Sequence, residues 1–378
     1  MTVTLLILVI IPLPVQSQTV ELEDKIYGML IGSVIGDAAG GPLEFIHPPL
    51  RGFWTTTDKK ITQGGILALA DSFRLRPYLK EAEPFAQWEP FAAAGTITDD
   101  TRFKLIFFNM VEHNKGQMTR TLFAREVLAF GNRLPEKYKS RFDQWMVEIG
   151  FATRWTLGIR ENAYPNDRIW GGIPTMAGQM PFLPVAAFYA DNAEAAYLKT
   201  WELNYLDVAF AKDITAALVA GLVGALQEGG DWRTVEAYMR NTDPYNFNNV
   251  LYVPRRMSEW LDIAHGMAAR ADGCPSVLFD IMEKELQAKT WWEAWVPIVV
   301  VFACAEIVHY NPLAAMQLMI EFGHDTDSYA QVMGAIMGAI HGKEIFPVNL
   351  RDEVNRRMKE QFGRNVDDWL QLIRLAQK

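Results

Sequence analysis

The stretch "GMLIGSVIGDAAGG" (28–41) decides the fold. Glycine stands at every fourth position of this apolar segment, and the acids of "ELED" (21–24) precede it. Each glycine inside a helix costs about 0.5–1 kcal/mol relative to alanine, so four in register must be offset by packing. The spacing therefore predicts a helix with a smooth groove that another helix can approach closely.

A second glycine ladder, "GAIMGAIHG" (334–342), lies near the C-terminus. We expect both ladders to belong to central helices that pack closely together, and the two ladders could face each other. A membrane dimer of the GxxxG type is the rival explanation. Asp37 inside the first ladder and the acids before it argue against that rival. A third face of small residues passes through Ala217, Gly221 and Ala225.

The remaining chain reads as helical almost throughout, because apolar residues recur at three- and four-residue spacing and strand-like alternation is scarce. No linker or low-complexity segment divides it, so residues 18–378 are predicted to form one all-α domain, a compact orthogonal multi-helix bundle. Irregular stretches are expected at 161–184, where a long ordered loop is usually functional, and at 241–254. Further helices are expected at 119–132, 140–157, 193–206, 232–240, 255–270, 275–288, 293–309, 312–322 and 351–376.

The composition is that of a globular protein: of 378 residues, 50% are hydrophobic and 21% charged. The net charge of −9 argues against nonspecific binding to nucleic acid or to an anionic membrane. We therefore expect neither partner, and we expect a monomer.

Cys274 and Cys304 are the two cysteines, too few for a disulfide framework. Cys304 lies in an apolar run and is expected to be a free, buried thiol.

The first residues, "MTVTLLILVIIPLPVQSQ" (1–18), carry no charge. An apolar core followed by small residues predicts a secretory signal peptide, residues 1–17, cleaved after Ser17, and hence export to the periplasm or medium. The run is too short to span a bilayer. It lacks the usual Lys or Arg near the start, and a buried N-terminal strand is the alternative.

The stretch "TITDDTRF" (96–103) places two acids in front of an apolar run. Thr98 is a good N-cap residue, and Asp99 and Asp100 would then lie in the first turn, where the helix dipole favours negative charge. Considered alone, this is an ordinary helix start. The stretch "GHDTDS" (323–328) repeats the pattern directly before the second ladder.

Acids therefore cluster at the ends of three segments that should be buried, because Glu44 also follows the first ladder. If those ends converge, five carboxylates share one place. Two like charges about 4 Å apart repel by roughly 4 kcal/mol at an effective dielectric of 20. No matching run of Arg or Lys accompanies the motifs, so bound divalent cations are the natural compensation. Ligation by Asp, Thr and Ser oxygens suits Mg²⁺ or Mn²⁺, and a shared carboxylate could bridge two ions.

Three stretches, "GSVIGDAAGGPLE" (32–44), "TDDT" (98–101) and "GHDTDSYAQVMGAIMGAIHG" (323–342), resemble in that order the signature regions of the ADP-ribosylglycohydrolase family, which includes dinitrogenase reductase-activating glycohydrolase. The resemblance runs from about residue 25 to 342. It implies an all-α fold and a centre of two Mg²⁺ or Mn²⁺ ions. It also implies cleavage of the bond between ribose and a nitrogen or oxygen leaving group.

The resemblance also assigns roles to individual residues. Glu44 matches an acid that in relatives lies at the mouth of the site, and Asp37 matches a family position too. No second oxygen-rich residue stands beside Asp37, so we expect it to be structural, and we take Asp100 and Glu44 as the candidate catalytic acid or base. Asp327 would be the bridging ligand. Carried over position by position, the metal ligands would be Thr98, Asp99, Asp100, Asp325, Asp327 and Ser328.

Three positions depart from the family pattern. His324 replaces a glycine, which would alter the wall of the pocket, although alone such a histidine is more often structural. Ser328 replaces a threonine but keeps the hydroxyl, and Pro181 stands where many relatives carry an arginine. Gly178, Gln179 and His324 are the candidate substrate contacts. Aromatic residues that could stack on an adenine are Tyr164, Trp170, Tyr245 and Phe247.

The sequence thus predicts a metal-dependent hydrolase of ADP-ribosyl or related ribosyl linkages, acting on a small-molecule or ADP-ribosylated substrate. Two alternatives stay open. One is a scaffold that binds metal or ADP-ribose without turnover, which would not need five costly carboxylates. The other is an exported glycosidase for nucleosides or other small ribosides.

Overall fold

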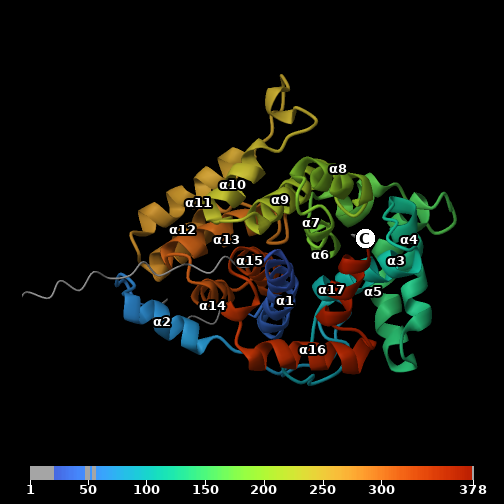
Figure 1. The fold of residues 1–378 in the computed structure, drawn as a ribbon, viewed down its shortest axis with the longest axis horizontal. Coiled ribbons are helices and arrows are strands. Elements are labelled where there is room, and N and C mark those ends of the chain that lie inside the picture. Colours follow the sequence, from blue (N-terminus) through green and yellow to red (C-terminus); the bar gives the residue numbers. More distant parts are fainter. Residues whose placement is uncertain (1–20, 47–51, 53–56, 377–378) are drawn as a thin grey trace, which may run out of the picture.

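The computed structural model describes residues 21–46, 52 and 57–376 of the chain (Figure 1). Within these residues the secondary structure is helical, and an isolated antiparallel bridge between Thr175 and Glu293 is the only β pairing. The prediction of an all-α protein is confirmed. The helices are α1 (Leu22–Gly40), α2 (Gln63–Ser72), α3 (Asp99–His113), α4 (Arg120–Phe130), α5 (Glu136–Thr156), α6 (Gln179–Phe182), α7 (Val185–Phe188), α8 (Ala193–Leu203), α9 (Ala211–Leu226), α10 (Trp232–Asn241), α11 (Met257–Ala271), α12 (Pro275–Glu285), α13 (Trp295–Ile307), α14 (Pro312–Phe322), α15 (Thr326–His341), α16 (Val348–Phe362) and α17 (Val366–Ala376).

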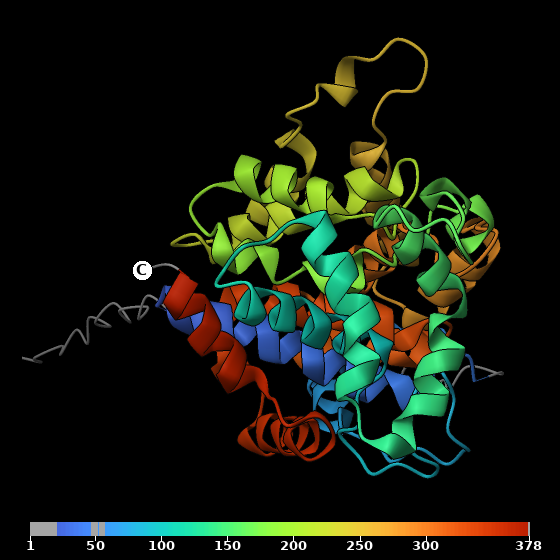
Figure 2. The ribbon, with the colours of Figure 1, turned by 90° about the vertical axis from the view of Figure 1, so that its right-hand side faces the viewer.

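The two ladder helices, α1 and α15, run antiparallel side by side through the middle of the molecule (Figures 1 and 2). A Cβ atom at Gly28 would collide with the carbonyl of Gly338, and one at Gly32 with the carbonyl of Gly334. The ladders therefore face each other, as the sequence allowed. By length and composition, the segment Leu22–Leu43 could also cross a membrane, but it is mostly buried inside the protein.

The third small-residue face lies on α9. A Cβ atom at Gly221 would meet the side chain of Met239 on α10, so the small residue admits that neighbour. Lys25 of α1 is buried, and its ammonium donates hydrogen bonds to the carbonyls of Ala225, at 3.0 Å, and Gln227, at 2.6 Å. These bonds fix the start of α1 against the end of α9.

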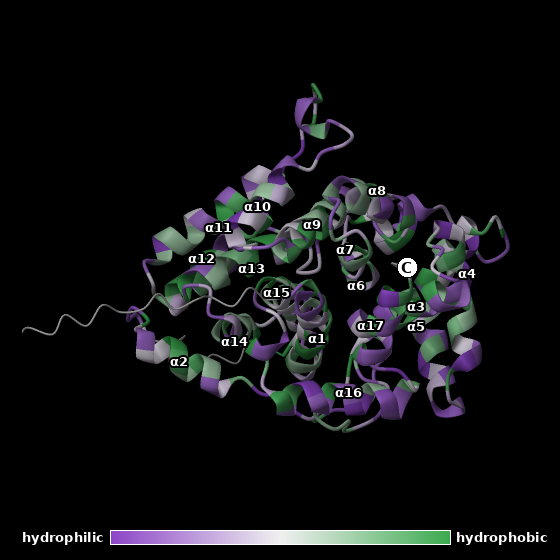
Figure 3. Ribbon diagram, in the orientation of Figure 1, coloured by the Kyte–Doolittle hydropathy of each residue, from purple (hydrophilic) through white to green (hydrophobic). Residues whose placement is uncertain are grey.

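The other helices surround this central pair. Helices α3 to α5 lie on one side, and α10 to α13 on the other, while α16 crosses the outer edge with a largely hydrophilic surface (Figures 1 and 3). His265 of α11 joins three of them, since its ring nitrogens lie 2.6 Å from a carboxylate oxygen of Glu306 and 2.9 Å from one of Glu236. Cys274 and Cys304 are buried free thiols, and burial raises the pKa of Cys304.

Some boundaries differ from the prediction. The helix expected at 351–376 is two helices, α16 and α17, because the chain turns at Gly363 with φ of +72°, in the left-handed region that ends helices. Helix α2 was not predicted. The stretch 241–254 forms the gold loop that projects between α10 and α11 (Figures 1 and 2). The signal peptide expected at residues 1–17 lies outside the described residues.

Candidate active site

The start of α3 forms one wall of the site. Thr98 is its N-cap, and the hydroxyl accepts a hydrogen bond from the backbone N–H of Asp100 at 3.3 Å. The same hydroxyl donates to Asp37 of α1 at 2.5 Å, and Asp37 also accepts from the backbone N–H of Thr101 at 3.2 Å. Asp37 thus holds the "TDDT" turn in place, in agreement with a structural role.

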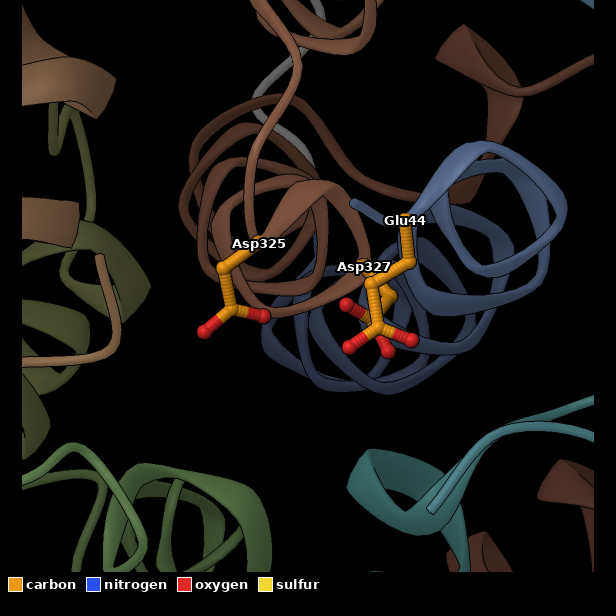
Figure 4. Close-up of side chains that lie close together, drawn as sticks. All are labelled: Glu44, Asp325 and Asp327. Atoms are coloured by element: carbon orange, nitrogen blue, oxygen red, sulfur yellow. The ribbon is translucent and has the colours of Figure 1, made fainter. Parts of the chain in front are cut away.

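The start of α15 forms the second wall, and the glycine ladder determines its position. The hydroxyl of Thr326 donates to the carbonyl of Gly40 at 2.9 Å. A Cβ atom at Gly40 would lie 2.5 Å from the Cα of Asp327, so a larger residue would push the two helix ends apart. The turn after α1 then brings Glu44 beside Asp325 and Asp327, with the three carboxylates pointing the same way (Figure 4).

The five predicted carboxylates converge in two groups of three. Oxygen atoms of Glu44, Asp325 and Asp327 lie within 4.8 Å of one another, and so do those of Asp99, Asp100 and Asp327. Asp327 belongs to both groups, which is the position expected of a bridging ligand. Its Oδ1 atom is buried and has no hydrogen-bond partner among the described residues. An all-oxygen donor set with such an atom fits Mg²⁺ or Mn²⁺.

The two hydroxyl groups predicted to be ligands also reach this cluster. Thr98 keeps a second lone pair after its bonds to Asp37 and Asp100. Ser328 is buried at the same place, and its hydroxyl donates to Asp100 Oδ2 at 3.1 Å. All six predicted metal ligands therefore lie at the meeting point of α1, α3 and α15.

A cavity of about 580 Å³ opens above the carboxylates. This volume suits a small organic ligand. Its described lining is Glu44, Phe45, Lys80, Glu83, Phe85, Asp99, Asp100, Trp170, Thr175, Met176, Ala177, Met180, Trp292, Asp325, Asp327 and Ser328.

The family sequence pattern described as ADP-ribosylglycohydrolase matches residues 18–378. The chain belongs to the ADP-ribosylglycohydrolase family. The uncharacterised protein YegU of Escherichia coli (strain K12) is 22% identical over 352 residues, which cover 90% of this chain and 95% of YegU. A solved chain titled "ADP-ribosylglycohydrolase-related protein complex" is 15% identical, with a TM-score of 0.57 over 94% of this chain and 99% of that one. This second likeness shows that the fold is shared.

The clustered carboxylates of this family member have strongly shifted pKa values. Burial, followed by repulsion from Asp327 and other neighbouring acids, raises the pKa of Glu44, Asp100 and Asp325 well above the ordinary range. Burial raises the pKa of Asp99 to about 7 and that of Asp327 to about 6. Without added positive charge, the folded protein therefore resists full ionisation of the cluster.

Two buried cations, Arg102 and Lys104, accompany the cluster, although no run of basic residues in the sequence indicates them. Arg102 donates to the carbonyl of Ala86 at 2.7 Å and lies over the ring of Trp88. Lys104 is fully buried and donates to the backbone carbonyl of Asp100 at 3.1 Å and to the side chain of Gln331. Gln331 in turn donates to Asp100 Oδ1. These two cations offset only part of the charge of the carboxylates.

The predicted substrate contacts lie elsewhere. Gly178 lies outside the described lining of the cavity; its N–H donates to Asp207 at 2.7 Å, and a Cβ atom there would strike Asn204. Gln179 is fully buried and donates to the carbonyl of Ala294 at 3.0 Å. Both residues therefore hold the loop behind the cavity rather than line it.

His324 also lies behind the site. Its ring stacks on Trp291 with centroids 3.6 Å apart, and its Nε2 atom lies 2.8 Å from a carboxylate oxygen of Glu283. Its carbonyl accepts the N–H of Phe45 at 2.8 Å. His324 thus supports the turn that carries Glu44, and it is absent from the described lining of the cavity.

Among the four aromatic candidates, Trp170 lines the cavity. Tyr164 packs on Phe151, and Tyr245 and Phe247 pack around Trp201, outside the described lining. No periodic pattern in the sequence points to the other lining residues, because all but Met180, in the short helix α6, lie outside the helices. They are Phe45, Lys80, Glu83, Phe85, Thr175, Met176, Ala177, Met180 and Trp292.

Proposed function

We propose that this protein is a metal-dependent hydrolase that cleaves the N- or O-glycosidic bond of ADP-ribosyl substrates at a centre of two Mg²⁺ or Mn²⁺ ions. The observation that carries the proposal is the pair of three-carboxylate groups that share Asp327 on the floor of a cavity. Membership of the ADP-ribosylglycohydrolase family supplies the substrate class.

The ligands of the two ions would be Thr98, Asp99, Asp100, Asp325, Asp327 and Ser328. When bound, the ions supply positive charge that polarises the ribose hydroxyls and lowers the pKa of water. Asp327 would hold both positions in register, and the "TDDT" turn, fixed by Asp37, would set the position of one of them.

Asp100 and Glu44 are the two candidates for the carboxyl group that transfers a proton during cleavage. Asp100 is buried and accepts hydrogen bonds at both oxygens, from Ser328 and Gln331, an arrangement that suits a fixed ligand. Glu44 is partly exposed in the lining of the cavity and is not one of the six predicted metal ligands, so its carboxyl group can exchange a proton with substrate and water. We therefore assign proton transfer to Glu44, in a cleavage with an oxocarbenium-like transition state.

The test is a hydrolysis assay with Mg²⁺ or Mn²⁺ on ADP-ribosylated arginine, ADP-ribosylated serine and simple nucleosides. Glu44→Gln should lose most turnover while still binding Mn²⁺, whereas Asp327→Asn should lose both. Activity that survives EDTA would contradict the metal mechanism. Metal binding without hydrolysis of any substrate would favour a non-catalytic scaffold.

Export stays part of the proposal, since the family match begins at residue 18, directly after the predicted leader. An exported enzyme would meet nucleosides and other small ribosides, which keeps a riboside glycosidase as the second candidate. We also propose a monomer without nucleic-acid or membrane partners. Fractionation of producing cells and light scattering of the purified chain test these points.

A further inference from the structure

The lining of the cavity includes a positively charged side chain to which the proposed mechanism gives no role. Lys80 is the one basic side chain in the described lining, which also contains six carboxylates. In the structure its ammonium lies 3.2 Å from a carboxylate oxygen of Glu83, and the Lys80 side chain is one-third exposed. Its charge also acts on Glu44, opposing the rise in the pKa of that carboxyl.

Hydrogen bonds within the loop hold the backbone at Lys80 in place. The backbone N–H of Phe91 donates to the carbonyl of Lys80 at 3.0 Å, and the buried side chain of Gln87 donates to the carbonyls of Lys80, at 3.3 Å, and Glu81, at 2.7 Å. Two stretches of the loop, around residues 80–81 and 87–91, are thus tied together at Lys80. Such bracing reduces the conformational entropy that a ligand would have to remove.

The same loop is attached to the helix that bears the predicted metal ligands. The guanidinium of Arg102 donates to the carbonyls of Pro84, at 3.2 Å, Phe85, at 3.1 Å, and Ala86, at 2.7 Å. The N–H of Asp99 donates to the carbonyl of Phe85 at 3.2 Å. These hydrogen bonds hold residues 84–86, four to six residues beyond Lys80, against the start of α3.

The positive charge of Lys80 limits which part of a ligand can bind beside it. The cluster would be occupied by cations and by the ribose that they grip, so an anionic group of the substrate needs a separate counter-charge. Ammonium is a common phosphate ligand, acting as a compact point charge. A neutral riboside has no group that requires Lys80.

We infer that Lys80 anchors a phosphate group of the substrate and selects phosphate-bearing ribosides over neutral ones, with Glu83 holding the ammonium in the free enzyme. This inference rests on the proposed glycosidase function, whose substrate class it narrows. It favours ADP-ribosyl compounds over nucleosides.

Calorimetric titration of the Mg²⁺-loaded protein with ADP-ribose and with adenosine tests the inference. Lys80→Met should weaken ADP-ribose binding about tenfold or more, the loss expected for a charge-assisted hydrogen bond, and leave adenosine within about twofold. Lys80→Arg should restore most of the affinity. Glu83→Gln should strengthen ADP-ribose binding, because it frees the ammonium. Lys284→Met, at an exposed position of α12 outside the cavity, should change neither.

Equal weakening of both ligands by Lys80→Met, or no weakening of either, would overturn the inference, and so would weaker ADP-ribose binding in Glu83→Gln. The titration does not depend on turnover. If no glycoside is hydrolysed while Lys80→Met still weakens ADP-ribose alone, the proposed hydrolase fails and the phosphate anchor stands.

Discussion

Asp327→Asn should make the metal-free protein more stable and the metal-loaded protein less stable than the wild type. Asp327 is the carboxylate common to both groups of three, so in the absence of metal it faces repulsion from each. Burial raises its pKa from 3.8 to about 6. A difference of about two pKa units corresponds to about 3 kcal/mol, by which the ionised side chain destabilises the fold.

The sign follows from the direction of the shift. A carboxyl whose folded pKa is raised binds its proton more tightly in the folded state, so stability falls as pH rises from 3.8 through about 6. The advantage of Asp327→Asn in EDTA should therefore be complete at pH 8 and absent near pH 4. For a chain of 378 residues, about 3 kcal/mol corresponds to roughly 4 °C in Tm.

In the presence of Mg²⁺ the wild type should become more stable than Asp327→Asn. An ion at one hundred times its Kd adds about 2.7 kcal/mol to the wild type, and two ions add about twice that, whereas the variant has lost the shared ligand. The assay is thermal unfolding at pH 4 and pH 8, in EDTA and in Mg²⁺. Asp207→Asn is the matched control: burial raises the pKa of Asp207 to about 6 as well, but Thr215, Asn204 and Gly178 donate hydrogen bonds to it, outside the cluster.

The control should respond to Mg²⁺ as the wild type does. An Asp327→Asn protein that is less stable than the wild type in EDTA at pH 8 would refute the reasoning, since the carboxylate would then be held by favourable partners. An equal Mg²⁺ response in both proteins would refute its role as a shared ligand.

Three further predictions concern the frame around the site. Gly338→Ala should lower the free energy of unfolding by at least about 3 kcal/mol in chemical denaturation, because the added methyl group meets the backbone of the facing helix. Gly266→Ala, in open space on α11, should raise it by about 0.5–1 kcal/mol. Similar effects of the two substitutions would contradict the packing of the ladders. Burial opposes the charge of His265, but its hydrogen bonds to Glu236 and Glu306 outweigh burial and raise its pKa. The charged histidine therefore stabilises the fold fully below pH 6.5, and this stabilisation is lost as pH rises further. His265→Gln should therefore lower Tm more at pH 6 than at pH 9, and an equal loss at both values would exclude the charged pairing. Lys104→Met removes a buried cation beside Asp100 and should tighten Mn²⁺ binding about tenfold in calorimetry; weaker binding would show that the lysine positions its neighbour instead.

Local chemistry explains why the ladder contact and the acid cluster could be predicted. A helix tolerates glycine at every fourth position only when another backbone approaches it, and the contact between Gly28 and Gly338 bears this out. Asp99 and Asp100 stand just before an apolar run, and Glu44 stands just after the first ladder. These acids must therefore lie where buried segments end. Helix ends that carry repelling carboxylates then imply a common cation.

The same reasoning could not locate residues whose role depends on distant neighbours. Gly178 and Gln179 were assigned by position in the chain, but their contacts with Asp207 and Ala294 turn them away from the cavity. His324 is close to the ligands in sequence, yet it stacks on Trp291 behind them.

The sequence by itself determined the helical fold, and it indicated that the two glycine ladders pack closely and that the acids share one site, because apolar spacing, glycine spacing and the charge of a segment can be read from local patterns. The tertiary structure decided that the two ladders face each other. The tertiary structure alone decided which loop faces those carboxylates. Arg102 donates hydrogen bonds to the carbonyls of residues 84–86, and Lys80 of the same loop lines the cavity together with Asp327. That contact joins segments with no shared periodicity, and only the packing of the folded chain brings them together.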